Sequence, residues 1–394
     1  MGLEVAPERQ RQSQRNSESV NQASKLEEWR SALACGEDRE VTFTLLLTKR
    51  CNFACAHCMF GAAPQGDAGW MAFEVLDEVL LAARTFGDWG FRSRLNLLGG
   101  EPTLDLERFA AIYTYIWRHP LSQDLEMEMT TNGWWLRSWK DTCRFAGIVG
   151  ESVARERLSI RISNSIWHDA FRKGEKHIIS RRALQEALEN PCEWFDLPEP
   201  LCQCGGALVC EENSHRCDGC GERMSEEEYY DTRDAALMQP GHHAIPLLLE
   251  GIKSGNVGVD AKWTEPERLS PAGRALKNGM GQQDGLCHPA PELKFTINPD
   301  GSIRDVCCYG GRAPLGHIRG GALRLFALRY ELLKAVHEQF PQAEERLHRN
   351  CNGGKRCRGC LGFASRWLRR EKPKLEPLLR EFERVEQPAV ELAA

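Results

Sequence analysis

The fold is decided by residues 41–58, which read VTFTLLLTKRCNFACAHC. The first eight of these residues are β-branched, leucine or phenylalanine, a composition typical of a buried strand. Cys51, Cys55 and Cys58 follow at once in the pattern CxxxCxxC. Soft sulfur ligands at this spacing favour an iron–sulfur cluster, and a set of three would leave one iron open. Buried cysteines or an incomplete zinc site are the alternatives.

Strand and helix signals alternate four times from this stretch onward. Such alternation predicts an α/β fold with a parallel sheet and right-handed crossovers. Chemistry in these folds gathers where the strands end, and the segments Cys51–Cys58, Gly99–Pro102 and Thr131–Gly133 follow predicted strands. The predicted strands cover residues 41–48, 94–98, 125–131 and 158–163, and the predicted helices begin near Phe73, Leu106, Ser138 and Arg181.

Composition narrows the class of protein further. The chain has 394 residues, of which 42% are hydrophobic and 27% charged, enough for one large domain or two to three smaller ones. Its net charge of -5 argues against bulk attraction to nucleic acid or anionic membranes. Residues 1–30 are polar and lack a secretory signal pattern. Seventeen cysteines in such a chain indicate metal ligands or buried thiols in a reducing cytoplasm.

Two motifs together carry a family resemblance. Cys51-Asn-Phe-Ala-Cys55-Ala-His-Cys58, with Gly99-Gly100-Glu101-Pro102 after the next strand, resembles the radical S-adenosylmethionine (radical SAM) superfamily over residues 41 to about 190. The resemblance implies a partial (β/α)6 TIM-like barrel. It implies that the three cysteines hold a 4Fe-4S cluster whose open iron binds S-adenosylmethionine. Reductive cleavage would then yield a 5′-deoxyadenosyl radical that abstracts hydrogen from the substrate.

The same resemblance assigns residues to S-adenosylmethionine. Gly99 and Gly100 would let the backbone approach the cofactor, and the Glu101 carboxylate would accept a hydrogen bond from its ammonium group. The looser matches have structural alternatives, such as a plain turn or an exposed side chain. They are His57 near adenine, Asn132 after the third strand, Ser163 and Asn164 near the ribose, and Arg172 near the methionine carboxylate; Asn164 stands where the family usually has an acidic residue. Pro102 completes the Gly-Gly-Glu-Pro motif and is assigned to the cofactor with it.

A second group of cysteines lies in residues 191–232, which we interpret as an inserted module. Two pairs, Cys202-x-Cys204 and Cys217-x-x-Cys220, are each followed by glycine and resemble the knuckles of a zinc ribbon. The first knuckle is CxC where CxxC is usual, so Cys210 is an alternative ligand. Zinc would contribute folding energy to an insert with little core, and a further iron–sulfur cluster is the alternative.

A third group of six cysteines begins at residue 287 and flanks a hairpin signal over residues 295–303. It resembles the SPASM and twitch extensions of radical SAM enzymes and implies one auxiliary 4Fe-4S cluster, with a second zinc site as the alternative. The implied ligands are Cys287, Cys307, Cys357 and Cys360, with Cys308 and Cys351 as alternates.

The predicted organisation has six parts. They are a polar, disordered arm (1–38) with a short helix around Leu26–Ala34, the main part of the radical SAM core (39–190), the zinc-ribbon-like insertion (191–232), the end of the barrel with a linker (233–286), a small α+β SPASM/twitch-like domain (287–365) and a charged helical tail (366–394).

The predicted function is that of a radical SAM oxidoreductase acting on a peptide or protein, as peptide maturases do. A radical SAM enzyme for a small molecule or cofactor precursor is the alternative. The expected partners are a low-potential electron donor of flavodoxin or ferredoxin type and the substrate or its carrier, with no membrane. An iron–sulfur electron carrier or a zinc-ribbon nucleic-acid-binding protein is the rival from another class. Six glutamates within residues 211–228 argue against nucleic acid.

Overall fold

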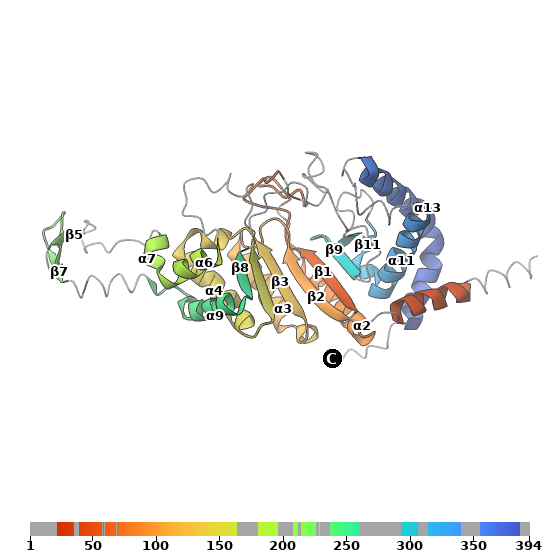
Figure 1. Cartoon of the computed structure of the whole chain (residues 1–394), viewed down its shortest axis with the longest axis horizontal. Helices are drawn as coiled ribbons and strands as arrows, with labels where there is room; N and C mark the ends of the chain where they lie inside the picture. Colours follow the sequence, from red (N-terminus) through yellow and green to blue (C-terminus); the bar gives the residue numbers. More distant parts are fainter. Residues whose placement is uncertain are drawn as a thin grey trace, which may run out of the picture. The chain divides into compact units, whose positions relative to one another are not determined.

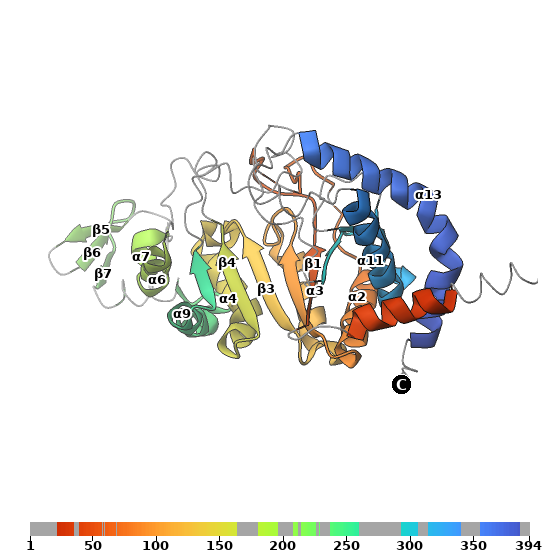
Figure 2. The same ribbon diagram turned by 45° about the vertical axis from the view of Figure 1, so that its right-hand side comes forward.

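The computed structural model describes residues 22–34, 39–56, 58, 60–67, 69–163, 180–195, 208–211, 214–225, 228, 237–259, 293–305, 314–339 and 355–386. The chain divides into two compact units, which are taken separately here (Figures 1 and 2). The first unit comprises residues 1–100, 118–126 and 265–394, and the second comprises 101–117 and 127–264.

The first unit is built on a mixed sheet. Its strands are β1 (Glu40–Leu46), β2 (Arg92–Leu98), β9 (Leu293–Ile297), β10 (Ser302–Asp305) and β11 (Gly316–His317). Strand β1 pairs in parallel with both β2 and β9. Strand β10 is antiparallel to β9 and to β11, which confirms the hairpin predicted at residues 295–303. The hairpin thus continues the sheet of β1, although some 250 residues separate the two in sequence.

The two faces of this sheet differ in chemistry. Phe43 of β1 and Phe295 of β9 are neighbours in register with ring centroids 5.9 Å apart, and each packs with Phe86 of helix α2 (Phe73–Asp88) at a centroid distance of 6.1 Å. On the opposite face, Thr44 lies between Asn96 of β2 and Thr296 of β9. One face therefore forms the helix-covered core, and the other carries polar side chains.

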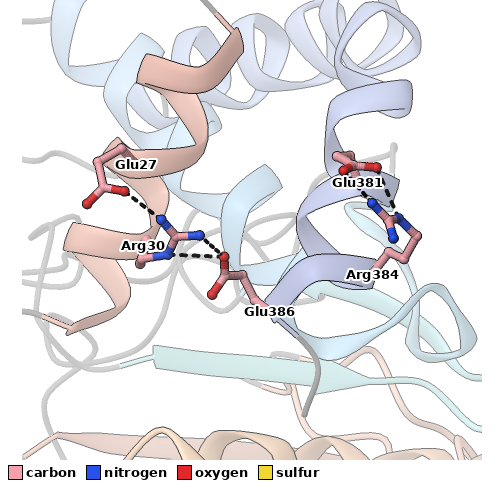
Figure 3. Close-up of polar contacts among 5 residues, drawn as sticks. All are labelled: Glu27, Arg30, Glu381, Arg384 and Glu386. Carbon is pink, nitrogen blue, oxygen red and sulfur yellow. Dashed lines mark hydrogen bonds and ion pairs between the residues drawn. The ribbon is translucent and has the colours of Figure 1, made fainter. Parts of the chain in front are cut away.

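Helices at both ends of the sequence pack together in the first unit. They are the helix over residues 22–34, α11 (Ala322–Gln339) and α13 (Lys355–Glu386). Trp29 is fully buried, packs edge-on against Phe382 of α13, and donates to Glu331 of α11 at 2.8 Å. Arg30 bonds Glu386 of α13 (Figure 3). The short helix predicted around Leu26–Ala34, within an arm expected to be disordered, thus covers residues 22–34 and is anchored by the Trp29 indole.

Helix α13 is longer than the sequence suggests. It has 32 residues and continues through the domain boundary predicted at 365/366. Pro373 and Pro377 lie inside it, both exposed. Proline removes one backbone hydrogen bond and usually ends or kinks a helix, yet this helix continues through both positions.

The second unit repeats the parallel pattern. Its strands β3 (Glu126–Thr131), β4 (Leu158–Ile162) and β8 (Val257–Val259) pair in parallel in that order. In its core, the aromatic rings of Phe109, Trp135 and Phe145 stack on one another.

A separate antiparallel sheet has the strands β5 (Leu208–Glu211), β6 (Ser214–Cys217) and β7 (Arg223–Ser225). The helices are α3 (Leu106–Arg118), α4 (Trp139–Ala154), α6 (Arg181–Glu189), α7 (Pro191–Trp194) and α9 (Ile245–Ser254), and the short 3-10 turns of the chain cover Pro120–Ser122, Trp134–Arg137, His242–Ala244 and Ile318–Gly320.

The predicted α/β fold with a parallel sheet is confirmed. Within the described strands, the sheet of neither unit closes on itself, as expected for a partial barrel. No helix in the described part of the chain has the length and hydropathy needed to cross a bilayer.

Candidate active site

The cysteine loop leaves the end of β1 and returns to it. The Met71 amide donates to the Leu47 carbonyl at 2.8 Å, which closes the base of the loop. Above the base, the Cys51 amide donates to the Ala63 carbonyl at 3.1 Å. The loop is therefore held by backbone bonds across its two arms, so that the chain leading to Cys51 has a fixed path.

The three cysteines differ in burial within this loop. Cys51 and Cys55 are 8% and 5% exposed, whereas Cys58 is half-buried. The Phe53 amide donates to the Cys51 sulfur at 3.3 Å, and the Cys58 amide donates to the Cys55 carbonyl at 3.1 Å. An amide donor at a sulfur is compatible with a thiolate ligand. The structure thus places the three predicted ligands in one tight, mostly sheltered loop.

Gly99 and Gly100 lie against this loop. The Gly100 amide donates to the Thr48 carbonyl at 2.7 Å. A Cβ at Gly99 would stand 2.5 Å from the Thr48 oxygen, and a Cβ at Gly100 would overlap the Arg50 carbonyl. Gly99 also has a φ of +138°, which other residues rarely adopt. The sequence predicted that these glycines allow the backbone to approach a ligand. The structure shows that they allow close approach of the backbone that leads to Cys51.

Glu101 is fully buried and accepts four hydrogen bonds. One oxygen accepts from the Thr103 amide (2.9 Å), the Thr103 hydroxyl (2.5 Å) and the Thr131 hydroxyl (2.7 Å), and the other accepts from the Asn132 amide (2.6 Å). Burial raises the pKa of Glu101, and these hydrogen bonds oppose the rise. The carboxylate therefore connects the turn that follows β2 to the end of β3. Thr131 belongs to the segment Thr131–Gly133 that the sequence singled out. Thr103 was missed, and its place two residues after Glu101 was the signal that could have pointed to it.

The end of β3 is shaped by side chains that cap a turn. The side-chain oxygen Oδ1 of Asn132 accepts from the Trp134 amide at 3.1 Å, and Gly133 has a φ of +80°. This geometry is that of an Asx turn, the structural alternative for Asn132. Ser163 follows β4 and donates its amide to the Thr131 carbonyl at 2.8 Å, so that the ends of β3 and β4 meet.

Several predicted residues lie outside the described part of the chain. Pro102 is described and buried, but His57, Asn164 and Arg172 are outside it. The same holds for Cys202, Cys204, Cys287, Cys307, Cys308 and Cys351, and for the side chains of Cys210, Cys357 and Cys360, whose backbones lie in β5 and α13. Their assignments stay predictions.

The second half of the zinc-ribbon motif is described. Cys217 ends β6 and is fully buried, and its sulfur accepts from the amides of Gly219 and Cys220 at 3.3 and 3.5 Å. Cys220 is exposed at the turn. His215, 7% exposed, lies two residues before Cys217 and therefore on the same face of β6, and its register partner is Cys210. His215 was missed in the sequence, where strand alternation with Cys217 was its signal.

Comparison with known proteins identifies part of the chain. Residues 45–174 match the family model of the radical SAM superfamily. A GTP 3',8-cyclase of Sulfurimonas denitrificans is 32% identical over 136 residues, which are 33% of this chain and 39% of that protein. A GTP 3',8-cyclase of Nautilia profundicola is 28% identical over 150 residues, 36% and 42% of the two chains. The match thus spans about two fifths of these curated relatives.

The solved structures that match this chain include BtrN in complex with AdoMet and 2-DOIA. It is 10% identical, the match covers 77% of this chain and 91% of that chain, and the TM-score is 0.42. Native anSMEcpe with bound AdoMet has 16% identity, coverage of 86% and 99%, and a TM-score of 0.38. The superfamily consists of enzymes that use a 4Fe-4S cluster and S-adenosylmethionine, so the family match implies both cofactors here. Residues 45–174, which include the cysteine loop and the Gly-Gly-Glu-Pro turn, form a radical SAM domain.

Proposed function

We propose that this radical SAM enzyme is an oxidoreductase that abstracts hydrogen from a peptide or protein substrate. The observation that carries the proposal is the fit between two loops. The loop of Cys51, Cys55 and Cys58 rests on Gly99 and Gly100 so closely that neither glycine has room for a Cβ. Loops at the ends of parallel strands are where such folds bind ligands.

The donor set of the cysteine loop suits the implied metal group, although the three thiols are not gathered into a metal-binding cluster among the described residues. Its three thiols lie within eight residues, and the two most buried are sheltered from solvent. When bound by Cys51, Cys55 and Cys58, a 4Fe-4S cluster supplies the electron for reductive cleavage of S-adenosylmethionine. The loop itself contributes a fixed backbone path and partial exclusion of water.

Glu101 has room for a role in addition to its bonds within the protein. One of its oxygens accepts three of the four donors and the other accepts one. A carboxylate oxygen has about two acceptor positions, so the second oxygen can take one further donor. We infer that this donor is the methionine ammonium of S-adenosylmethionine, which would also stabilise the buried charge.

The polar face of the first sheet supports a polar substrate. Thr44, Asn96 and Thr296 form a row across β2, β1 and β9, a short distance below the strand ends. Among the described residues, neither the buried side-chain oxygen of Asn96 nor the buried hydroxyl of Thr296 has a hydrogen-bond partner. Such groups cost about 1–3 kcal/mol each when left unpaired. Amide and hydroxyl groups of a substrate would satisfy them.

Two further metal sites belong to the proposal. Cys287, Cys307, Cys357 and Cys360 would hold an auxiliary 4Fe-4S cluster, with Cys308 and Cys351 as alternates, and Cys202, Cys204, Cys217 and Cys220 would hold zinc. The buried Cys217 sulfur with its two amide donors supports the zinc site. So many metal-binding thiolates require reduced cysteines, which favours the reducing cytoplasm as the location of the protein. The C-terminal cysteines resemble those of SPASM and twitch extensions, and enzymes with such extensions often modify peptides, which favours a peptide substrate.

A small-molecule substrate is the second candidate. It is favoured by relatives named GTP 3',8-cyclase, at 32% and 28% identity. Incubating the reduced protein with S-adenosylmethionine and GTP tests it. We expect no consumption of GTP; its conversion would replace the peptide with a nucleotide as the substrate.

The core of the proposal is tested by release of 5′-deoxyadenosine from S-adenosylmethionine under anaerobic, reducing conditions. We expect Cys55→Ala to abolish release, because two thiolates cannot hold the cluster securely. Cys143→Ala is the matched control, since Cys143 is fully buried in α4 and lies outside the cysteine loop. Release by Cys55→Ala at the unaltered rate would refute the ligand assignment.

A further inference from the structure

Positive charge is concentrated in one helix of this acidic chain. Residues 355–374 contain eight Lys or Arg residues and a single acidic residue, Glu371, whereas the whole chain has a net charge of -5. All twenty positions belong to the first part of α13. Such asymmetry indicates an electrostatic role rather than random surface composition.

The helix presents part of this charge on one exposed stripe. Arg366, Arg369, Arg370 and Lys374 are all exposed, and their spacing of three, four and eight residues places them on one face; we call them the basic stripe. Trp367 and Leu368 are buried and anchor the helix. Lys372 is not part of the stripe, because its ammonium donates to the Leu315 carbonyl at 2.8 Å.

The stripe is poorly neutralised. Glu371 serves both Arg370 (2.5 Å) and Lys374 (3.0 Å). No carboxylate of the described residues pairs with Arg366 or Arg369. Further along the same helix, Arg380 and Arg384 are also exposed, but each pairs with a carboxylate. Arg380 pairs at 3.4 Å with Glu376, which also pairs with Arg324, and Arg384 pairs with Glu381 at 2.7 Å (Figure 3 shows the second pair). Within α13, the excess of positive charge therefore lies in the first part of the helix.

The basic stripe lies close in sequence to two proposed ligands of the auxiliary cluster. Cys357 and Cys360 occupy the first turns of α13, and Arg366 follows Cys360 after about 9 Å of helix. Figures 1 and 2 both show these first turns at the edge of the sheet where β1 leads into the cysteine loop. A protein bound at the stripe would thus stand near the proposed iron–sulfur centres.

We propose that the basic stripe is the docking surface for a small acidic protein that carries single electrons. The inference rests on the proposed function, whose chemistry consumes an electron from outside the chain. One electron leaves the reduced carrier, which is oxidised by one unit, and enters a cluster of this protein, which is reduced by one unit. No bond forms or breaks in the encounter. Complementary charge raises the rate of such encounters and orients them.

The test compares two double variants of α13. Arg366→Gln/Arg369→Gln removes two charges of the stripe that no described carboxylate neutralises, and Arg380→Gln/Arg384→Gln removes two exposed charges that pair with carboxylates. Release of 5′-deoxyadenosine is measured with two electron sources, a reduced acidic flavodoxin and dithionite. With flavodoxin, we expect the stripe variant to raise the KM for the carrier five- to tenfold and the control variant to change it less than twofold. With dithionite, both variants should match the parent within twofold.

Salt supplies an independent readout. Raising NaCl from 50 to 200 mM should increase the KM for flavodoxin in the parent protein and clearly less in the stripe variant, because screening acts on the charges that the variant lacks.

Each outcome decides a separate question. Equal KM values for flavodoxin in the parent and stripe variants would overturn the docking proposal. Loss of the dithionite rate in the stripe variant would show a structural role and also overturn it. Failure of the parent with dithionite would instead overturn the proposed function itself.

Discussion

At the scale of single residues, Glu101 is a carboxylate that is both buried and hydrogen-bonded. Its carboxylate is fully buried, which disfavours charge, yet four donors within the protein surround it. The sequence predicted this residue from its motif. It could not show that Thr103, Thr131 and Asn132 supply the donors, because a hydrogen bond between the turn after β2 and the end of β3 depends on tertiary structure.

The protonation of Glu101 gives a prediction for stability. Burial raises the pKa of Glu101 above its ordinary value of 4.5, although its hydrogen bonds oppose the rise. A carboxyl group with a raised pKa binds its proton more tightly in the folded state, so its contribution to stability is complete below pH 4.5 and decreases as the pH rises through the folded-state value. Glu101→Gln does not titrate. The free energy of unfolding of the parent, relative to Glu101→Gln, should therefore fall as pH increases over this window.

Denaturant unfolding of both proteins at a series of pH values measures this difference. Glu107→Gln is the control, because Glu107 is exposed on α3 and its side chain has an exposed fraction of 80%. A constant offset between the parent and Glu101→Gln from pH 4.5 to pH 8 would contradict a raised pKa.

At the scale of elements, local pattern predicted most strands and helices to within a few residues. The run at residues 41–48 became β1 (Glu40–Leu46), and the run at 158–163 became β4 (Leu158–Ile162). Alternation and helical periodicity are properties of neighbouring residues, so they survive in a single sequence. The pairing of β9 with β1 and the docking of Trp29 onto Glu331 and Phe382 are not local, and no periodicity encodes them.

The contact between the loops that follow β1 and β2 gives the prediction at this scale. Gly100→Ala should displace the backbone leading to Cys51, because the new Cβ would overlap the Arg50 carbonyl, which cannot move aside as a flexible side chain can. We expect the purified protein to lose more than half of the iron bound at the cysteine loop. We also expect a loss of stability on the order of 1–3 kcal/mol, as for other overpacked sites.

A second glycine supplies the control. Gly87 lies in helix α2, and a Cβ there would meet no atom within 4 Å. Gly87→Ala should leave iron content unchanged and raise stability by about 0.5–1 kcal/mol, since alanine favours helix over glycine. Iron analysis and thermal unfolding check both variants. Equal iron content in Gly100→Ala and Gly87→Ala would show that the close approach does not position the cysteines.

At the scale of the whole molecule, the cysteines fall into three groups far apart in sequence, and each group has its own proposed metal. The loop of Cys51, Cys55 and Cys58 belongs to the first unit, as do Cys357 and Cys360 at the start of α13, whereas Cys217 and Cys220 belong to the second. If each group binds metal alone, losing one should leave the other two intact.

Metal analysis of the anaerobically purified full chain tests this independence. The parent should contain about eight iron atoms and one zinc, as expected for two 4Fe-4S clusters and one four-thiolate site. Cys217→Ala/Cys220→Ala should lose the zinc and keep all the iron. Cys357→Ala/Cys360→Ala should lose about four iron atoms, keep the zinc, and retain the absorption of the remaining cluster.

The pattern of losses separates the alternatives for each group. Iron lost from Cys217→Ala/Cys220→Ala would make the insertion a further iron–sulfur site, and zinc lost from Cys357→Ala/Cys360→Ala would place a second zinc site in the C-terminal group. Joint loss of all metals from either variant would show that the sites fold as one cooperative structure. Perturbation of the remaining cluster by S-adenosylmethionine in Cys357→Ala/Cys360→Ala would then assign cofactor binding to Cys51, Cys55 and Cys58, because a cluster ligated by three thiolates keeps an iron to which that cofactor can bind.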